Sequence, residues 1–114
     1  MGNRKRFLTG LILLVLLAAF AHGQSINANM YGNVKNEDGK YLSAVLVTAT
    51  NVKNNSETTT TTGKKKGAFR FLSLAPGLYQ VSFDIEGYQP LILSGIQLNS
   101  EQSVTLRVKL KKME

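Results

Sequence analysis

Short runs of alternating hydrophobic and polar residues, separated by turn-forming residues, follow one another from residue 25 to the end of the chain. Turn residues recur about every eight to twelve positions, which is typical of a β-sandwich or β-barrel. No 3.6-residue hydrophobic repeat continues past residue 23. The pattern therefore predicts an all-β domain with seven strands, at residues 28–35, 44–52, 57–62, 68–72, 78–85, 88–94 and 103–110.

The clearest part of this pattern runs from Gly67 to Tyr88 and predicts a strand, a tight turn, a second strand and another turn. The first turn is Ala75-Pro76-Gly77, in which proline presets φ and glycine accepts the positive φ that often follows. Alternate apolar residues share one side of each strand: Phe69 and Phe71 in the first, and Tyr79, Val81, Phe83 and Ile85 in the second. Strands with one apolar and one polar face form sheets that must pack on another sheet, so we expect a sandwich.

Two of the predicted strands are expected at sheet edges. Residues 57–62 are a glutamate and five threonines, which favour a strand but offer no apolar side chain to a core. Pro90 limits residues 88–94 to an edge or a bulge, and Gly95 to Leu98 is expected to lead from that strand into a polar turn. Both features predict strands that pair on one side only.

The first 23 residues have the pattern of a secretory signal peptide. Three basic residues at positions 4–6 precede an apolar run at 7–21, and residues 21–23 place small side chains at the −3 and −1 positions of a cleavage site. The apolar run is shorter than the about 20 residues that a membrane span needs. We expect cleavage after Gly23, a domain at residues 24–114 without a transmembrane span, and a location in the periplasm, in the outer membrane or outside the cell.

The composition excludes several kinds of chemistry. The chain has no cysteine, and its single histidine, His22, lies in the predicted signal peptide. Thiol catalysis, Ser-His-Asp and Cys-His sites, and zinc sites built from cysteine or histidine are therefore excluded from the mature domain. No phosphate-binding glycine loop or dinucleotide fingerprint is present. We expect a protein that is not an enzyme, with no catalytic residue, cofactor or metal.

Charge adds little to the choice of partner. Without residues 1–23 the chain has eleven basic and seven acidic residues, a net charge of +4. This bias is weak evidence for nucleic-acid binding, and an exported protein is a poor candidate for that role. We expect no nucleic-acid partner.

Two acidic motifs have a simpler explanation than a site. Asp84 and Glu86 lie two residues apart and could in principle form a glycosidase pair, but a solvated strand face explains them. The segment Asn36-Glu37-Asp38-Gly39 resembles half of a calcium loop. Lys40 follows it directly and the twelve-residue EF-hand spacing is missing, so an Asx turn is the preferred interpretation.

Two groups of residues are candidate ligand contacts. Lys64, Lys65 and Lys66 form the one dense charge cluster, which could meet a phosphate, an acidic glycan or an anionic lipid headgroup, or could be a solvated loop that protects an edge strand. Three tyrosines predicted on outward faces or turns could stack on sugar rings or could cover a sheet end: Tyr31, Tyr41 and Tyr88.

A series of motifs matches a known family. The motifs are Gly32-Asn33-Val34, Asp38-Gly39, the run 44–51, Gly67-Ala68-Phe69-Arg70-Phe71, Leu74-Ala75-Pro76-Gly77-Leu78-Tyr79 and Gly87-Tyr88. Together they resemble the carboxypeptidase regulatory-like domain, over about Ala28 to Leu110. The resemblance implies a transthyretin-like, seven-stranded Greek-key sandwich, grouped with starch-binding-like domains. One departure is Lys64, which stands where the family usually has an acidic or amide residue, so any cation-binding or turn-capping role of that residue is lost.

The resemblance also implies a role. In metallocarboxypeptidases this domain follows the catalytic domain and is not itself catalytic. We therefore expect an exported accessory or interaction module of the bacterial envelope, with a carbohydrate, an envelope glycan, or an outer-membrane or cell-surface protein as partner. Similar domains also follow the signal peptide of TonB-dependent outer-membrane transporters. The alternative is thus an N-terminal extension or truncated fragment of such a transporter, since the chain stops about where a plug domain would begin.

Overall fold

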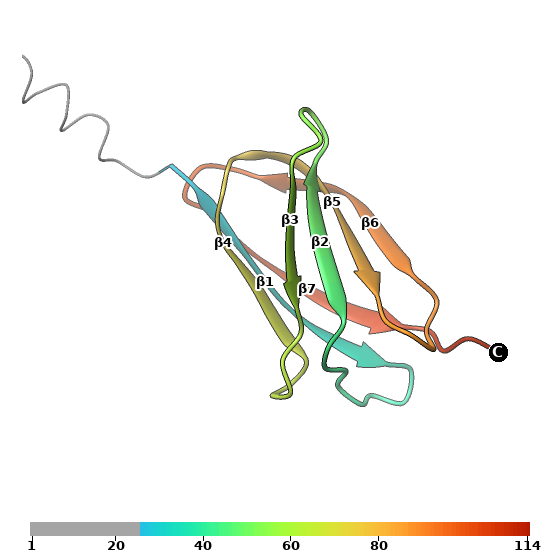
Figure 1. Cartoon of the computed structure of the whole chain (residues 1–114). Coiled ribbons are helices and arrows are strands. Elements are labelled where there is room, and N and C mark those ends of the chain that lie inside the picture. The colour runs from blue at the N-terminus through green and yellow to red at the C-terminus, as the bar shows by residue number, and fades with distance from the viewer. Residues whose placement is uncertain (1–25) are drawn as a thin grey trace, which may run out of the picture.

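Residues 26–114, which the computed structural model describes, form two β-sheets that face each other (Figure 1). The predicted signal peptide and its cleavage site lie outside the described residues. The strands are β1 (Ala28–Asn36), β2 (Leu46–Asn51), β3 (Glu57–Thr61), β4 (Ala68–Leu74), β5 (Gly77–Asp84), β6 (Leu91–Leu98) and β7 (Ser103–Leu110). This arrangement confirms the predicted all-β sandwich of seven strands.

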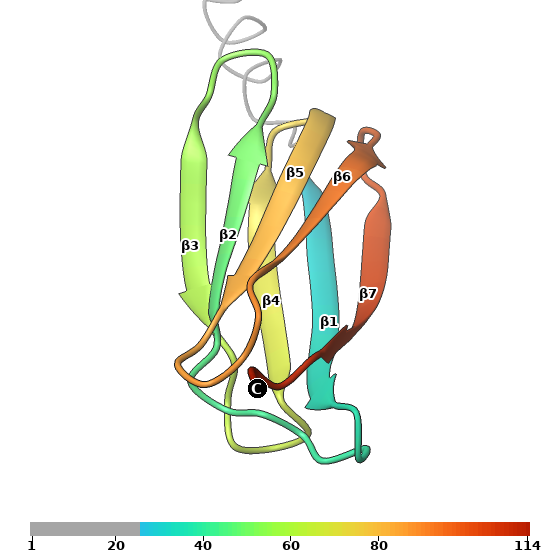
Figure 2. The same ribbon diagram turned by 90° about the vertical axis from the view of Figure 1, so that its right-hand side faces the viewer.

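The two sheets have the strand orders β4-β1-β7 and β3-β2-β5-β6 (Figure 2). In the three-stranded sheet, β1 is antiparallel to β4 and parallel to β7, so the first and last strands of the domain are neighbours. In the four-stranded sheet, β5 returns to lie beside β2 after the chain has visited β4 in the other sheet. This return is a Greek-key connection. It places β3 and β6 at the edges of their sheet, as the threonine run and Pro90 predict.

The segment between β4 and β5 crosses from one sheet to the other. The sequence predicts a strand, a tight turn and a strand here, but β4 pairs with β1 and β5 pairs with β2 and β6, so the turn closes no hairpin. A bulge near the end of β4, with Ser73 at φ 63°, lets Leu74 as well as Phe71 face inward. The Tyr79 hydroxyl then donates a hydrogen bond of 2.7 Å to the Ala75 carbonyl oxygen, which holds the crossing in place.

The last strand of the four-stranded sheet differs from the prediction. Residues 88–94 were expected as the strand, whereas β6 runs from Leu91 to Leu98. The expectation that Gly95 leads out of the strand is wrong, because Gly95 adopts a φ of 73° at a register shift within the pairing with β5. A bulge of this kind uses glycine to accept the left-handed backbone without ending the strand.

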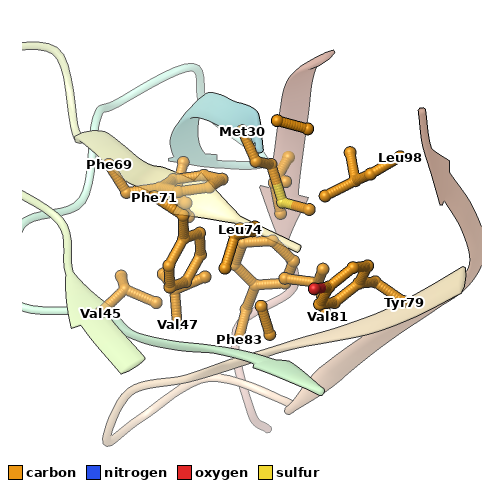
Figure 3. Close-up of a cluster of buried hydrophobic side chains, with 14 of the residues drawn as sticks. Met30, Val45, Val47, Phe69, Phe71, Leu74, Tyr79, Val81, Phe83 and Leu98 are labelled. Carbon is orange, nitrogen blue, oxygen red and sulfur yellow. The ribbon is translucent and has the colours of Figure 1, made fainter. Parts of the chain in front are cut away.

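The core lies between the sheets and contains the inward residues that the alternation predicts (Figure 3). Phe69 packs edge-to-face against Phe71 and Phe83, with ring centroids 6.1 and 5.6 Å apart. Phe69 and Phe71 come from β4 and Phe83 comes from β5, so the aromatic contacts join the two sheets. Ile85 lies after the end of β5 and is half-buried against this core.

Candidate functional site

The outward side of the three-stranded sheet gathers basic, amide and hydroxyl side chains on one surface. Because side chains alternate along a strand, the residues between the buried positions of β1, β4 and β7 point away from the core. We call this surface the basic face. It consists of Tyr31, Asn33 and Lys35 from β1, Arg70 from β4, and Thr105, Arg107 and Lys109 from β7.

The pairing of the strands sets which of these residues are neighbours. Tyr31 lies opposite Arg70 on one side and Thr105 on the other. Asn33 lies opposite Arg107, and Lys35 lies opposite Lys109. Neighbouring strands are about 4.8 Å apart, so the face carries a compact set of cations around a tyrosine and an asparagine.

Two depressions meet at Asn33 on this surface. The smaller has a volume of about 340 Å³ and is lined by Asn33, Lys35, Tyr41, Lys66, Arg107 and Val108. The larger has a volume of about 800 Å³ and extends past β4 to β3; its lining includes Tyr31, Asn33, Thr60, Lys65, Arg70 and Thr105. Asn33 contributes to both, so the depressions form one continuous candidate surface.

The lysine loop, residues 63–67, is fixed against the end of β1. Lys66 and Gly67 both have left-handed backbones, with φ values of 58° and 53°. The Asn33 Nδ2 group donates to the Lys66 carbonyl oxygen at 3.0 Å, and the Val34 N–H donates to the Gly67 carbonyl oxygen at 2.9 Å. These bonds bring Lys65 and Lys66 to the two depressions.

Thr62 anchors the other end of this loop. Its buried hydroxyl donates to the Leu42 carbonyl oxygen at 2.7 Å and accepts from the Val45 N–H at 3.0 Å. A buried hydroxyl with both a donor and an acceptor partner avoids the cost of an unsatisfied polar group. The loop that carries the lysines therefore starts from a fixed point in the sandwich.

The structure brings together four of the six side chains proposed from the sequence. Tyr31, Tyr41, Lys65 and Lys66 line the two depressions. Lys64 is exposed and lines neither depression. Tyr88 lies elsewhere: it is half-buried, packs against the core and forms an isolated bridge with Lys112, which is the arrangement of a side chain that covers a sheet end.

The sequence reasoning missed the residues of the basic face apart from Tyr31. Asn33 lies inside a family motif and was taken as part of it, while the basic residues of β1, β4 and β7 were read only as outward positions. A usable signal was present in the charges of the strands. Every charged residue in the strands of the three-stranded sheet is basic: Lys35, Arg70, Arg107 and Lys109. The strands of the four-stranded sheet carry only Glu57 and Asp84.

The acidic motifs form no site among residues 26–114. The Asn36 side-chain oxygen accepts hydrogen bonds from the backbone N–H groups of Asp38 at 3.0 Å and Lys40 at 2.9 Å, which confirms the Asx turn. Asp84 and Glu86 are exposed at the end of β5 and in the following turn. The described residues contain no group of three or more side chains that could hold a metal ion. They also contain no helix long and apolar enough to cross a membrane.

Comparisons with known proteins support the architecture. Residues 29–111 match the carboxypeptidase regulatory-like domain. No curated protein sequence matches this chain significantly. The TIE protein of Bacillus anthracis has a similar structure, with a TM-score of 0.64 and 19% identity over 79% of this chain. A candidate carbohydrate-binding protein from Bacteroides uniformis has a TM-score of 0.59 and 13% identity over 74% of this chain.

An enzyme of the same architecture is also similar. The 3-chlorocatechol 1,2-dioxygenase of Rhodococcus opacus has a TM-score of 0.57 and 12% identity over 79% of this chain. The chain spans 17%, 41% and 61% of the length of the Bacillus, Bacteroides and Rhodococcus proteins, respectively. At these identities the likeness shows a common sandwich fold, and sandwiches of this type occur in larger proteins of different function.

Proposed function

Because the chain belongs to the carboxypeptidase regulatory-like domain family, we propose that it is an exported, non-catalytic accessory module of the bacterial envelope that binds carbohydrate on its basic face. The predicted signal peptide supports export. The Bacteroides uniformis protein, with the same fold, is a candidate carbohydrate-binding protein.

One observation carries this proposal: Tyr31, Asn33 and Tyr41 line two depressions that meet on one surface. Sugar sites combine an aromatic surface, which packs on the apolar side of a pyranose ring, with polar groups that bind its hydroxyls. Tyr41 is half-exposed, and Tyr31 lies between Arg70 and Thr105 on the sheet. The strands and the anchored lysine loop hold these groups in place, so a ligand meets a surface that is already ordered.

The test is a glycan array probed with the full chain, containing neutral and acidic glycans. We expect binding to at least one glycan class, and a loss of about tenfold in affinity in the Tyr31→Ala/Tyr41→Ala double variant, since two aromatic contacts of about 0.5–1.5 kcal/mol each are removed. Tyr41→Ala alone tests the same point if the double variant unfolds, because Tyr41 is half-exposed.

Tyr88→Phe is the matched control. Tyr88 packs against the core away from both depressions, and its hydroxyl accepts only a long hydrogen bond of 3.5 Å from Asn36 Nδ2. The variant is expected to bind like the wild type. Absence of binding to every glycan, or binding unchanged in both tyrosine variants of the depressions, would contradict the proposal.

A second candidate is the N-terminal extension of a TonB-dependent transporter. The observation that favours a larger context is the short span of this chain relative to its structural neighbours. The reading frame downstream of residue 114 tests it. A plug and barrel sequence in frame would support the extension, and a stop codon after Glu114 would count against it.

A further inference from the structure

We propose that the carbohydrate bound on the basic face is an anionic polysaccharide, whose acidic groups pair with Lys35, Arg70, Arg107 and Lys109. This inference rests on the proposed carbohydrate-binding function and narrows its ligand class. It goes beyond the lysine loop, because the charges that carry it come from three strands of one sheet.

The first argument is the separation of charge between the two sheets. The strands of the three-stranded sheet carry basic residues and no acidic ones, and the strands of the four-stranded sheet carry Glu57 and Asp84 and no basic ones. A surface with charge of one sign attracts ligands of the opposite sign and raises their association rate. The basic face is therefore suited to a polyanion rather than to a neutral glycan alone.

The second argument is that the cations of this face have no partner within residues 26–114. None of Lys35, Arg70, Arg107 and Lys109 forms a salt bridge with a carboxylate of the described residues. Lys35 and Lys109 also lie directly opposite each other on the parallel strands β1 and β7. Like charges in that position destabilise a sheet. A bound anion would relieve this repulsion, so the arrangement favours binding at the expense of stability.

The third argument is the mixture of groups around the cations. Tyr31, Asn33 and Thr105 are interleaved with Arg70 and Arg107 across the strands. A sugar acid presents hydroxyls beside each carboxylate, and such a ligand needs both neutral hydrogen-bonding groups and cations. Tyr31 and Asn33 are half-buried in the lining of the depressions. This recessed arrangement favours a polysaccharide chain over the headgroups of a lipid surface.

The experiment measures binding of the full chain to polygalacturonate and to the same polymer after methyl esterification. The two probes share the sugar and the linkage, and esterification removes the negative charge. We expect binding to polygalacturonate that is at least about tenfold tighter than to the ester and that weakens as salt is added, because exposed charges are screened.

The variant Lys35→Gln/Arg107→Gln tests the face itself. We expect its affinity for polygalacturonate to fall by about tenfold or more, and its melting temperature to stay the same or rise, because Lys35 no longer repels Lys109. The control is Lys53→Gln/Lys112→Gln, which removes the same net charge from positions outside both depressions. The control is expected to bind within about twofold of the wild type.

Each other outcome overturns the inference in a recognisable way. Equal binding to both polymers leaves the carbohydrate-binding function intact and removes the requirement for an anion. Equal losses in the two charge variants mean that net charge, and not the basic face, governs binding. Binding to phosphatidylglycerol vesicles without binding to polygalacturonate replaces the polysaccharide with a lipid surface. Failure to bind either polymer or any glycan of the array removes both proposals.

Discussion

Replacing Phe83 with aspartate is expected to abolish the cooperative thermal unfolding of the domain. Phe83 is fully buried, and its ring packs against Phe69 of the opposite sheet. Removing a buried phenylalanine side chain costs about 3–5 kcal/mol, and an unpaired buried carboxylate adds several kcal/mol. Since small domains have net stabilities of about 5–15 kcal/mol, Phe83→Asp removes most or all of the stability.

The control for this prediction is Gln80→Asp. Gln80 is an exposed residue of the same strand, β5, so the substitution introduces the same charge without burying it. The measurement is a circular-dichroism melt of both variants. Gln80→Asp is expected to unfold cooperatively, at a melting temperature near that of the wild type. A cooperative melt of Phe83→Asp near the wild-type temperature would refute the inward position of Phe83.

Replacing Gly32 with alanine is expected to destabilise the domain by about 3 kcal/mol, because overpacking a core costs about 1–3 kcal/mol and occasionally more. Gly32 is buried in β1, and Phe69 occupies the space that a side chain would need. A Cβ atom at position 32 would overlap the Phe69 ring and lie 2.5 Å from the backbone oxygen of Leu106 on β7. The backbone oxygen cannot move without disturbing the pairing of β1 with β7.

Gly63→Ala is the matched control. A Cβ atom at Gly63 would meet its nearest neighbour, the Ala68 carbonyl oxygen, at 3.9 Å, which is an ordinary contact. Urea unfolding of both variants measures the difference in free energy. We expect Gly63→Ala to stay within about 0.5 kcal/mol of the wild type. Equal stability of the two variants would show that β1 and β4 do not approach as closely as the structure has them.

The faces of the strands could be predicted from the sequence, because the period of two is a local signal. The inward positions of β2, for example, follow from the alternation of Val45, Val47 and Ala49 with polar or exposed residues. Strand pairing has no such local signal. Phe71 and Tyr79 look like parts of one hairpin in the sequence, yet their strands lie in opposite sheets. The bulge at Gly95 was missed for a related reason, since a glycine in an apolar run fits a strand end as well as a bulge.

The candidate site was only partly predictable for the same reason. The lysine cluster and the tyrosines stand out in the sequence by composition alone. The basic face depends on the parallel pairing of β1 with β7, which are the first and last strands of the domain. Only this pairing places Lys35 beside Lys109 and Asn33 beside Arg107. Composition could therefore suggest a basic partner-binding loop, whereas the sheet that extends it required the structure.

The most direct test of the basic face as the binding surface is an NMR titration of the ¹⁵N-labelled protein with short oligogalacturonates. We expect the largest chemical-shift changes at the amides of β1 and β7 around Asn33 and Arg107 and in the lysine loop. The outer face of the four-stranded sheet, with Thr48, Ser82 and Ile92, is expected to change little. Shift changes concentrated on Thr48, Ser82 and Ile92, or no shift changes at all, would contradict the account.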